Sequence, residues 1–416
     1  MEKTIEKFKG KKILIWGCGR EGRSTEKLLR SKCSPAVLDT YEGPREGVHE
    51  ENYDYVFVSP GIPFEEDAPD WTNTKFTSQT EVFMEEYGAQ TVGITGTKGK
   101  STTSALLYTV LSACTDRSVF LMGNIGKPCF DYIDQMDPDS IAVFELSCHQ
   151  CQRLQADPHV AVFLDLFEDH LDRYHTLEHY FDAKCGITKH QTEDDILYAG
   201  SEVPPIRTKA QERIVDAEHV KGDFELRIPG AHNQFNAEVV CRIAEEVFGC
   251  REKEIREALS SFRGLPHRLE YAGTYDGIAY YDDSISTIPE AAINAVDAVP
   301  DTATVLIGGM DRGIDYDILI NFIRRRSDLN FILAYASGKR IYEQVKDCPN
   351  VYLVEDLEQQ VAKAGEITPQ GRAVVMSNAA ASYGYFKNFE ERGDCFKKLI
   401  QNHNNSCEGG HHEKTI

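Results

Sequence analysis

A glycine-rich segment ending in Lys-Ser, residues 93–103, contains the residue types that hold a phosphate group: Gly-Ile-Thr-Gly-Thr-Lys-Gly-Lys-Ser-Thr-Thr. An apolar strand is predicted before it at 91–95, and a helix is predicted to begin near Lys100. Backbone amides at the start of a helix bind anions, because they lack partners and the helix dipole favours negative charge. Lys100 would supply a positive charge to the outer phosphates, and Ser101 a hydroxyl to a magnesium ion. The segment therefore predicts binding of a nucleoside triphosphate.

This segment departs from the general phosphate-loop pattern G-x-x-x-x-G-K-[ST] at one position. Counting back from Gly99, the first glycine position holds Ile94. The narrower form G-T-K-G-K-S-T, at 96–102, is indicated instead of the general one.

A second glycine-rich turn, Gly-Cys-Gly-Arg-Glu-Gly at 17–22, follows a predicted strand at 12–16. With Asp39 about 20 positions further on, it matches the G-x-G-x-x-G fingerprint of dinucleotide-binding sheets. A third strand, at 55–58, ends in the turn Ser-Pro-Gly at 59–61, and open α/β sheets bind ligands at such strand ends. We expect a small parallel sheet whose loops contact a nucleotide or diphosphate. The alternative is that the glycines only allow close packing of helix on strand.

The middle of the chain alternates predicted strands and helices, which favours another parallel sheet. Its strand at 140–144 is followed by Glu145, at the position where a nucleotide-bound magnesium ion finds a protein ligand. Lys184 lies in a predicted helix, where the pattern alone predicts a surface lysine. The last third of the chain, from near Gly264, alternates strands and helices again.

Length and pattern together predict an α/β protein of three domains, because 416 residues exceed what one hydrophobic core usually serves. The expected boundaries are 1–89, 90–265 and 266–416. Each domain is expected to have a largely parallel sheet with flanking helices: Rossmann-like first and third domains, and a phosphate-loop ATPase domain between them. A polar tail from about residue 402 is expected to be disordered.

Bulk charge and composition restrict the partners. The formal net charge is −22, which repels nucleic acid and anionic membrane surfaces. No apolar run approaches the length of a membrane span and the first residues lack a signal-peptide core, so a cytoplasmic protein is expected. The twelve cysteines are scattered apart from Cys148 and Cys151, which we interpret as two small buried hydrophobic residues rather than a redox or metal site, because no second pair follows at zinc spacing. His411 and His412, in the tail, suggest no metal site.

Several short motifs occur together in an order that resembles the Mur ligases, the ATP-dependent enzymes that form amide bonds in peptidoglycan precursor synthesis. They lie at 96–102, 123–126, 145–147, 169–173, 232–236, 264–268 and 308–312. The resemblance covers about residues 10–400. Two further passages, at 59–63 and 382–393, resemble the members that join D-glutamate to UDP-N-acetylmuramoyl-L-alanine.

The resemblance implies a reaction in which ATP phosphorylates the substrate carboxylate, and the amine of glutamate then attacks the acyl phosphate. Such chemistry depends mainly on positioning and charge stabilisation. Lys100 would contact the β- and γ-phosphates. Two magnesium ions are implied, one bound by Ser101 and Glu145 and a second by His170. Lys184 matches a lysine that is carbamylated in relatives, and the carbamate would help to hold the second metal.

The resemblance also implies further binding residues. Asn124 would position the substrate carboxylate, and Arg268 would reach the nucleotide from the third domain with a catalytic role. The implied nucleotide set is Gly96, Thr97, Lys98, Gly99, Lys100, Ser101, Thr102, Asn233, Asn236, Arg268 and Asp283. The implied substrate set is Gly19, Arg20, Asp39, Thr40, Ser59, Pro60, Gly61 and Asn124 for the UDP-sugar, with Arg312, Ser382 and Phe389 for glutamate. The implied partners are UDP-N-acetylmuramoyl-L-alanine, glutamate and ATP, and we expect a monomer.

Three positions depart from the family pattern. Ile285 stands where a lysine is usual, Arg312 stands where lysine is common, and Asp165 stands where asparagine is frequent. The first two would lie on the side that receives the amino acid, and arginine binds a carboxylate differently from lysine. The main alternative is therefore a subgroup that adds L-glutamate. An NAD-dependent oxidoreductase, a folylpolyglutamate synthetase and a non-catalytic nucleotide-binding protein are the remaining alternatives.

Overall fold

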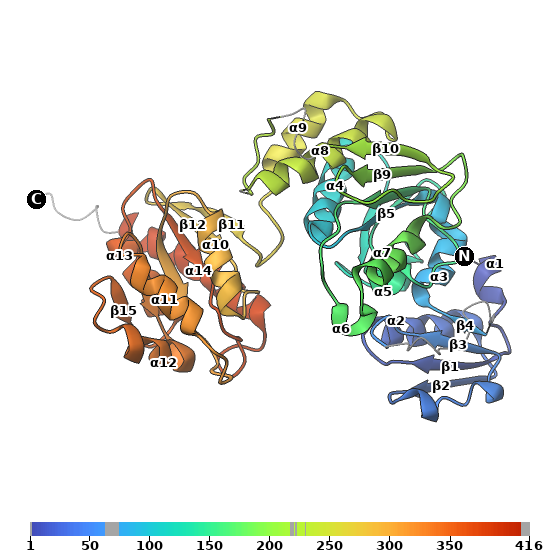
Figure 1. Ribbon diagram of the computed structural model, residues 1–416, viewed down its shortest axis with the longest axis horizontal. Coiled ribbons are helices and arrows are strands. Elements are labelled where there is room, and N and C mark those ends of the chain that lie inside the picture. The colour runs from blue at the N-terminus through green and yellow to red at the C-terminus, as the bar shows by residue number, and fades with distance from the viewer. Residues whose placement is uncertain (1, 63–74, 217–219, 221–222, 229, 409–416) are drawn as a thin grey trace, which may run out of the picture. The chain divides into compact units, whose positions relative to one another are not determined.

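The computed structural model describes residues 2–62, 75–216, 220, 223–228 and 230–408. The chain forms two compact units, one of residues 1–225 with 232–259 and the other of residues 226–231 with 260–416 (Figure 1).

The first unit begins with a small parallel sheet in the order β2-β1-β3-β4. Its strands are β1 (Lys12–Trp16), β2 (Val37–Tyr41), β3 (Tyr55–Val58) and β4 (Phe76–Thr77). Helix α2 (Arg20–Leu28) follows β1 as the glycine fingerprint predicts, and α1 (Glu2–Glu6) and α3 (Gln79–Tyr87) complete this region. The fingerprint loop therefore lies at the carboxyl edge of the sheet.

A second, fully parallel sheet in the same unit has the order β10-β9-β8-β5-β7-β6. The strands are β5 (Thr91–Thr95), β6 (Val119–Gly123), β7 (Ile141–Glu145), β8 (Val160–Phe163), β9 (Ile196–Gly200) and β10 (Gln211–Val215). Its helices are α4 (Lys100–Cys114), α5 (Cys148–Cys151), α6 (Leu171–Tyr174), α7 (Leu177–Cys185), α8 (Ala231–Glu246) and α9 (Glu252–Ser261). Strands β5, β7 and β8 are buried along their whole length, as is typical of central parallel strands.

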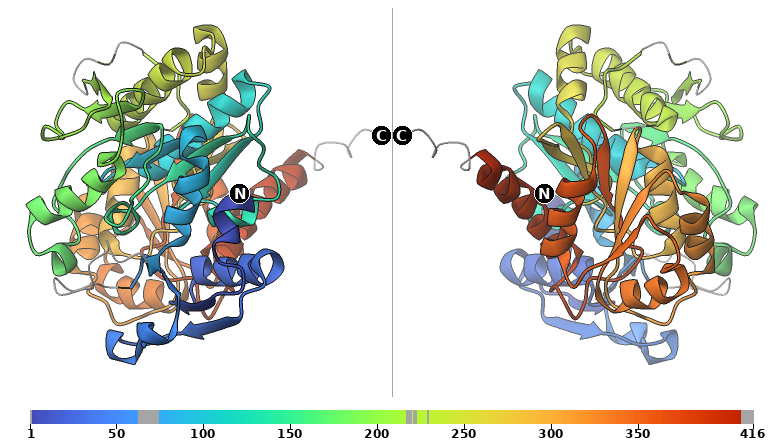
Figure 2. Two further views of the ribbon diagram at one scale, coloured as in Figure 1. Left: turned by 90° about the vertical axis from the view of Figure 1, so that its right-hand side faces the viewer. Right: turned by 90° about the vertical axis from the view of Figure 1, so that its left-hand side faces the viewer.

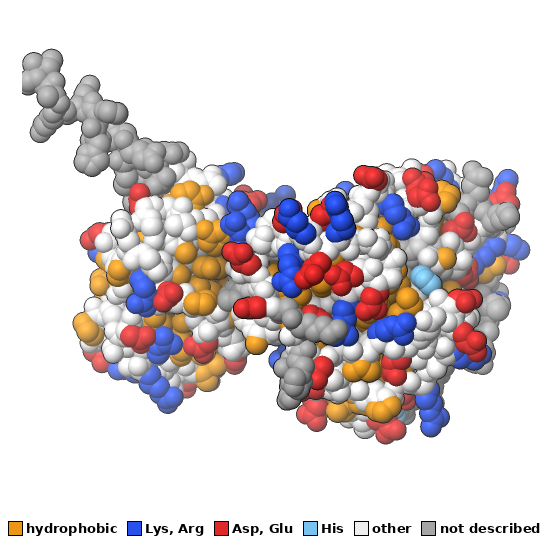
Figure 3. Space-filling view, turned by 90° about the horizontal axis from the view of Figure 1, so that it is seen from above, with side chains coloured by type: hydrophobic (Ala, Val, Ile, Leu, Met, Phe, Trp, Pro, Cys, Tyr) orange, Lys and Arg blue, Asp and Glu red, His pale blue; other side chains and the backbone are white. Residues whose placement is uncertain are grey.

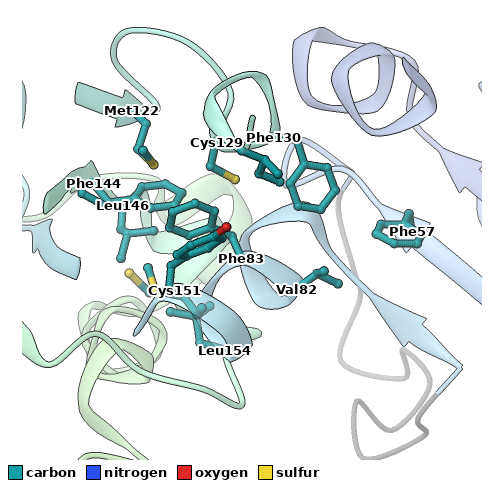
Figure 4. Packing of buried hydrophobic residues seen from close by; sticks show 14 of the residues in the cluster. Phe57, Val82, Phe83, Met122, Cys129, Phe130, Phe144, Leu146, Cys151 and Leu154 are labelled. Carbon is teal, nitrogen blue, oxygen red and sulfur yellow. The ribbon is translucent and has the colours of Figure 1, made fainter. Parts of the chain in front are cut away.

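The two sheets of the first unit share one hydrophobic core. Phe57 from β3, Phe83 from α3 and Phe144 from β7 belong to the same buried cluster (Figure 4). The Phe83 and Phe144 rings meet edge to face at 5.6 Å. The boundary predicted at 89/90 lies inside this compact unit, and the three-domain division stays a prediction.

The second unit contains a sheet in the order β11-β12-β16-β13-β14-β15. Strands β11 (Glu270–Tyr275) and β12 (Ile278–Asp282) form an antiparallel hairpin, and β13 (Thr302–Ile307), β14 (Asn330–Leu333), β15 (Val351–Leu353) and β16 (Ala373–Met376) continue it in parallel. Helices cover this sheet (Figure 2). One buried cluster includes side chains of α10 (Pro289–Ala298), α11 (Asp317–Arg325) and α12 (Tyr335–Val345), and a separate one includes side chains of α13 (Leu357–Ile367) and α14 (Phe389–Glu408). The predicted α/β class, with largely parallel sheets and flanking helices, is confirmed.

Two expectations about the surface and the tail can be compared with the structure. Helix α14 continues to Glu408, past the start predicted for a disordered tail, and His411 and His412 lie outside the described residues. In the described part of the chain, no helix is both long and apolar enough to cross a membrane. On the face shown in Figure 3, basic side chains are interspersed with acidic ones.

Candidate functional site

The phosphate loop joins β5 to α4 at the carboxyl edge of the central sheet, as predicted. Gly96 and Gly99 have φ angles of 150° and 77°, which side-chain-bearing residues rarely adopt. A Cβ atom on Gly99 would lie 2.9 Å from Oδ1 of Asn236, so α8 packs directly against the loop. Lys100 Nζ donates hydrogen bonds to the carbonyl oxygens of Gly96 (3.0 Å) and Thr97 (2.9 Å). The loop therefore holds its own lysine over the turn.

Asp165, which follows β8, anchors the same loop. Its Oδ1 accepts hydrogen bonds from the backbone amides of Thr97 (2.7 Å) and Lys98 (2.8 Å). A carboxylate accepting two amides is a strong anchor, and it also adds a negative charge beside the turn. This contact gives a structural role to one of the three departures from the family pattern.

Glu145 is the last residue of β7. It lies opposite Ile94 of the neighbouring strand β5, which leads directly into the phosphate loop. Its side chain is buried, with 1% exposed. Asn124 Nδ2 donates to Glu145 Oε1 at 2.8 Å, while Oε2 is covered and has no hydrogen-bond partner among the described residues. A buried carboxylate oxygen without a partner is costly, and a bound cation would satisfy it. The residues therefore fit a magnesium ion at this position.

Lys184, on α7, is buried against the phosphate loop. The pattern-based prediction of a surface lysine is wrong, since only 1% of the residue is exposed. Its Nζ donates to the carbonyl oxygen of Gly96 and lies 4.5 Å from the ring centroid of Tyr180. Burial, helped by the nearby charge of Lys100, lowers the pKa of Lys184 to about 8. The amine is therefore much more easily neutralised than that of an exposed lysine.

His170, at the start of α6, lies beside a second histidine that the motif analysis did not single out. The ring centroids of His170 and His149 are 5.2 Å apart, and 46% of the His170 side chain is exposed. His149 Nδ1 lies 2.7 Å from the hydroxyl oxygen of Tyr174. Burial, reinforced by the charge of Arg173, lowers the pKa of His149 to about 3. In the sequence, the only indication of a role for His149 was its position in the Leu-Ser-Cys-His-Gln segment after Glu145.

The other residues predicted for the nucleotide lie around the loop or on α8. Asn233 and Asn236 are buried in the first turns of α8, and Asn236 Nδ2 donates to Asn233 Oδ1 at 3.2 Å. Ser101 and Thr102 occupy the first turn of α4 and are half-buried. The fold thus brings the two asparagines of α8 and the first residues of α4 to the same edge of the central sheet.

A cavity of about 450 Å³ lies between the fingerprint loop of the first sheet and the end of β6. Six of the predicted substrate residues line it, together with others; the lining is Gly17, Cys18, Gly19, Arg20, Glu21, Glu42, Gly43, Ser59, Pro60, Gly61, Ile62, Gly123, Asn124 and Pro128. Asp39 and Thr40 are outside this set, on exposed positions of β2, where Asp39 accepts a hydrogen bond from Tyr53. The acidic residue that faces the cavity after β2 is Glu42, which accepts from the amide of Cys18.

The fingerprint glycines have different roles. A Cβ on Gly22 would lie 2.0 Å from the carbonyl oxygen of Gly17, so the close-packing alternative is correct for Gly22. Gly17, with φ of 98°, accepts through its carbonyl oxygen a 2.7 Å hydrogen bond from Ser59 Oγ. This bond joins the two turns that line the cavity.

Glu21 was not predicted as a site residue, because it occupies a variable position of the fingerprint. Gln150 Nε2, from α5, donates to its Oε1 at 2.8 Å, and its Oε2 is covered without a partner among the described residues. Burial raises the pKa of Glu21 to about 7. The contact links the fingerprint loop to the segment after Glu145.

In the second unit, Asp283 lies at the carboxyl edge of the sheet, just after β12. It is buried, and its carboxylate accepts hydrogen bonds from the hydroxyls of Ser286 and Ser377 and from the amide of Leu269. Burial raises its pKa to about 6. These contacts brace the segment after β12, and the nucleotide role of Asp283 stays a prediction.

The remaining predicted residues of this unit differ in exposure. Arg268 and Arg312 are exposed, with Arg312 donating to the carbonyl oxygen of Thr287 at 3.0 Å, while Ser382 is buried. Phe389 begins α14, and its carbonyl oxygen accepts from Ser284 Oγ. A residue that sequence reasoning missed, Arg392, is fully buried and donates to the carbonyl oxygens of Ser284 and Ala380. The nucleotide role of Arg268 and the glutamate roles of Arg312, Ser382 and Phe389 stay predictions.

Comparison with known proteins gives a consistent result. Residues 94–220 match the model of the Mur ligase middle domain. The chain is 33% identical to UDP-N-acetylmuramoylalanine--D-glutamate ligase of Aquifex aeolicus, covering 94% of this chain and 98% of that protein. It is 32% identical to UDP-N-acetylmuramoyl-L-alanine--L-glutamate ligase of Salinispora tropica, over 95% and 99% of the two chains.

Among solved structures, MurF ligase from Thermotoga maritima in complex with ADP aligns with a TM-score of 0.55 and 17% identity, over 96% of this chain and 97% of that one. The fold is thus that of a Mur ligase along nearly the whole chain. Together with the nearly full-length identity to curated ligases, this shows that the chain belongs to the Mur ligase family.

Proposed function

We propose that this chain is an ATP-dependent, ADP-forming ligase that adds D-glutamate to UDP-N-acetylmuramoyl-L-alanine in peptidoglycan precursor synthesis. One observation carries the proposal beyond the relatives' names: Asn124 both lines the 450 Å³ cavity and hydrogen-bonds to Glu145 beside the phosphate loop. A UDP-sugar bound in that cavity would therefore reach toward the loop that binds ATP. The Gly17 and Ser59 turns suit its diphosphate, because they present backbone groups at strand ends.

The acyl-phosphate step follows from the residues at the junction of cavity and loop. Asn124 would orient the substrate carboxylate toward the γ-phosphate, and Lys100 would stabilise the charge that develops on the transferred group. Magnesium, held by Ser101 and the unpartnered oxygen of Glu145, would neutralise phosphate charge when bound. The substrate carboxylate would bond to the γ-phosphorus as ADP leaves, and the amine of glutamate would then attack the carbonyl carbon of the acyl phosphate, lose a proton and displace inorganic phosphate.

We propose further that Lys184 is carbamylated. Carbon dioxide is attacked by the neutral amine, and a pKa of about 8 makes that form accessible near neutral pH. The amine loses a proton as it bonds to carbon dioxide, and the carbamate oxygens beside the loop would help to hold a second magnesium ion with His170. Tyr180 neighbours both residues: its ring centroid lies 4.5 Å from Lys184 Nζ and 6.0 Å from the centroid of the His170 ring. The carbamate also replaces a buried positive charge with a negative one.

The configuration of the added glutamate is the part of the proposal that needs a direct comparison. Relatives named for D-glutamate and for L-glutamate are 33% and 32% identical to this chain. Ile285 and Arg312 are the specific features that favour the L-glutamate alternative, since both depart from the common pattern on the amino-acid side.

The test is phosphate release from ATP with UDP-N-acetylmuramoyl-L-alanine and either D- or L-glutamate, run in parallel. We expect release to require both the nucleotide sugar and D-glutamate. If the nucleotide sugar supports phosphate release with L-glutamate but not with D-glutamate, the protein is the L-glutamate-adding ligase. Equal release when the nucleotide sugar or glutamate is left out would contradict the ligase assignment. A monomeric, cytoplasmic protein stays a prediction, which sedimentation and cell fractionation would check.

A further inference from the structure

A thiol and two imidazoles meet beside the phosphate loop. Cys148 and His149 lie in α5, and His170 is the N-cap residue of α6. Each has one atom that can bind a metal, and these three atoms lie within 4.8 Å of one another. Cys148 Sγ is 3.7 Å from His149 Nδ1, and Cys148 is buried. Cys148 is thus buried, as its sequence context predicts, and His149 and His170 bring two further ligand atoms close to its thiol.

We propose that Cys148, His149 and His170 form a site for a thiophilic divalent cation such as Zn²⁺. Thiolate and imidazole ligands suit Zn²⁺ and Co²⁺, whereas Mg²⁺ takes oxygen ligands almost exclusively. Three protein ligands leave a fourth position open for water or another oxygen donor. The site therefore differs in chemistry from the magnesium sites proposed for catalysis, although it shares His170 with one of them.

The surroundings of His149 support a ligand role. Tyr174 places its hydroxyl oxygen 2.7 Å from His149 Nδ1, and the two rings stack at 5.6 Å with an interplanar angle of 15°. Nδ1 cannot bind a metal while it keeps this hydrogen bond, so Nε2 is the ligand atom that we propose. An outer hydrogen bond that fixes the ring is the usual companion of a metal-binding histidine. The imidazole is therefore held in one orientation before any metal arrives.

The charges around the site make the Cys148 thiol the most important of the three ligands for binding a cation. Arg153, Arg173 and the uncarbamylated amine of Lys184 act on His149 with positive charge, which opposes a bound cation, whereas the proposed carbamate of Lys184 would favour one. Binding would form one metal–sulfur and two metal–nitrogen bonds and release the thiol proton to solvent, so the new thiolate offsets one charge. Removing Cys148 should therefore weaken binding more than removing a neutral ligand.

The site has a consequence that rests on the proposed function. His170 is proposed to serve the second magnesium ion, so a zinc ion bound at this cluster would withdraw it from catalysis. Zn²⁺ is then an inhibitor that competes for one ligand of the magnesium site.

Direct binding is tested by adding Co²⁺ to the metal-free full-length protein without substrates. We expect a thiolate-to-cobalt charge-transfer absorption that disappears in Cys148→Ser and persists in Cys348→Ser, a matched substitution of a partly exposed cysteine in the other unit. His149→Phe, which can keep the stacking on Tyr174, should weaken Zn²⁺ binding at least about tenfold. If Cys148→Ser fails to fold, the Zn²⁺ affinity of His149→Phe tests the site instead. An unchanged absorption in Cys148→Ser, or unchanged affinity in His149→Phe, would overturn the site.

Inhibition is tested separately, with saturating Mg²⁺ and increasing Zn²⁺. His149→Phe should keep the magnesium-dependent turnover but lose sensitivity to Zn²⁺, and equal inhibition of both proteins would overturn the inhibitory role. The cobalt absorption without any ligase turnover would contradict the proposed function while leaving the metal site intact. Ligase turnover without the cobalt absorption would contradict the metal site while leaving the proposed function intact.

Discussion

At the scale of single residues, burial gives Lys184 and Glu21 protonation equilibria unlike those of exposed side chains. Lys184 lies against Gly96 and Tyr180, and Glu21 lies between the fingerprint loop and Gln150. Both are close to the groups proposed to bind substrate or ATP. Strongly shifted pKa values at such positions are typical of functional sites.

Lys184→Ala is expected to lower turnover at least about a hundredfold, because it removes the proposed carbamate oxygens near the reacting phosphate. Short carboxylates such as acetate should restore part of the activity by occupying the vacated space. The measurement is phosphate release with and without added carboxylate. Lys189→Ala, which changes an exposed lysine just after α7, is the control and should behave as the unmodified protein. Full activity of Lys184→Ala would remove the residue from the mechanism.

Glu21 is expected to make the stability of the first unit depend on pH. Its pKa is about 7 in the folded protein and 4.5 as the reference value, so the folded state holds the proton more tightly than the unfolded chain. Stability is therefore lost as pH rises from the reference value through about 7, when a buried carboxylate must carry charge.

Glu21→Gln avoids that loss. Its gain in thermal stability over the unmodified protein should grow between about pH 5 and about pH 8, up to roughly 3 kcal/mol. Thermal unfolding followed at both pH values measures the difference. Glu46→Gln changes an exposed carboxylate in the same unit and should show no such trend. A gain for Glu21→Gln that is independent of pH would contradict the assignment.

At the scale of elements, the loop between β5 and α4 owes its shape to close contacts from both sides. Asp165 binds the amides of Thr97 and Lys98, and α8 brings Asn236 against Gly99. The turn is therefore held in place before nucleotide binds, which reduces the entropy lost on binding.

Gly99→Ala is expected to raise the KM for ATP about tenfold or more, because its methyl group would press on Asn236 and strain the loop. Gly249→Ala is a matched control: Gly249 has φ of 67° against 77° for Gly99, but a Cβ there meets nothing within 4 Å. Both substitutions should cost about 1–2 kcal/mol of stability from the backbone conformation. Steady-state kinetics and thermal unfolding separate the two effects, and equal KM values in both variants would contradict the packing argument.

At the scale of the whole molecule, the residues proposed for ATP occur in both compact units. Lys100 and Asn233 belong to the first unit, and Arg268 and Asp283 to the second. From the division of these residues between the units along the chain, we propose hinge closure over the nucleotide, which many ligand-binding enzymes use.

Closure is expected to lower the radius of gyration when UDP-N-acetylmuramoyl-L-alanine and a non-hydrolysable ATP analogue are added together. Small-angle scattering measures the change. The matched control is Lys100→Ala, which should bind the analogue weakly and stay closer to the unliganded value. An identical radius with and without both ligands would refute closure.

The sequence by itself determined the α/β class, the two glycine-rich strand–turn–helix segments and the family. The fingerprint at 17–22 and the phosphate loop at 96–102 predict strand, turn and helix correctly, because glycine positions and apolar runs act locally along the chain. The interpretation of Cys148 and Cys151 as buried residues is also confirmed. These features depend on backbone conformation and hydrophobic pattern, which neighbouring residues largely decide.

Only the tertiary structure decided which side chains meet. It buries Lys184 against Gly96, although helix periodicity alone predicts exposure, and it places Glu21 on Gln150 across 129 positions of the chain. It also brings His149 to His170 and directs Glu42, instead of Asp39, to the cavity. Pairing and burial depend on how sheets and helices pack over long sequence separations. The pKa values and unpartnered oxygens that define this site arise from that packing, so they cannot be read from residue types and spacing.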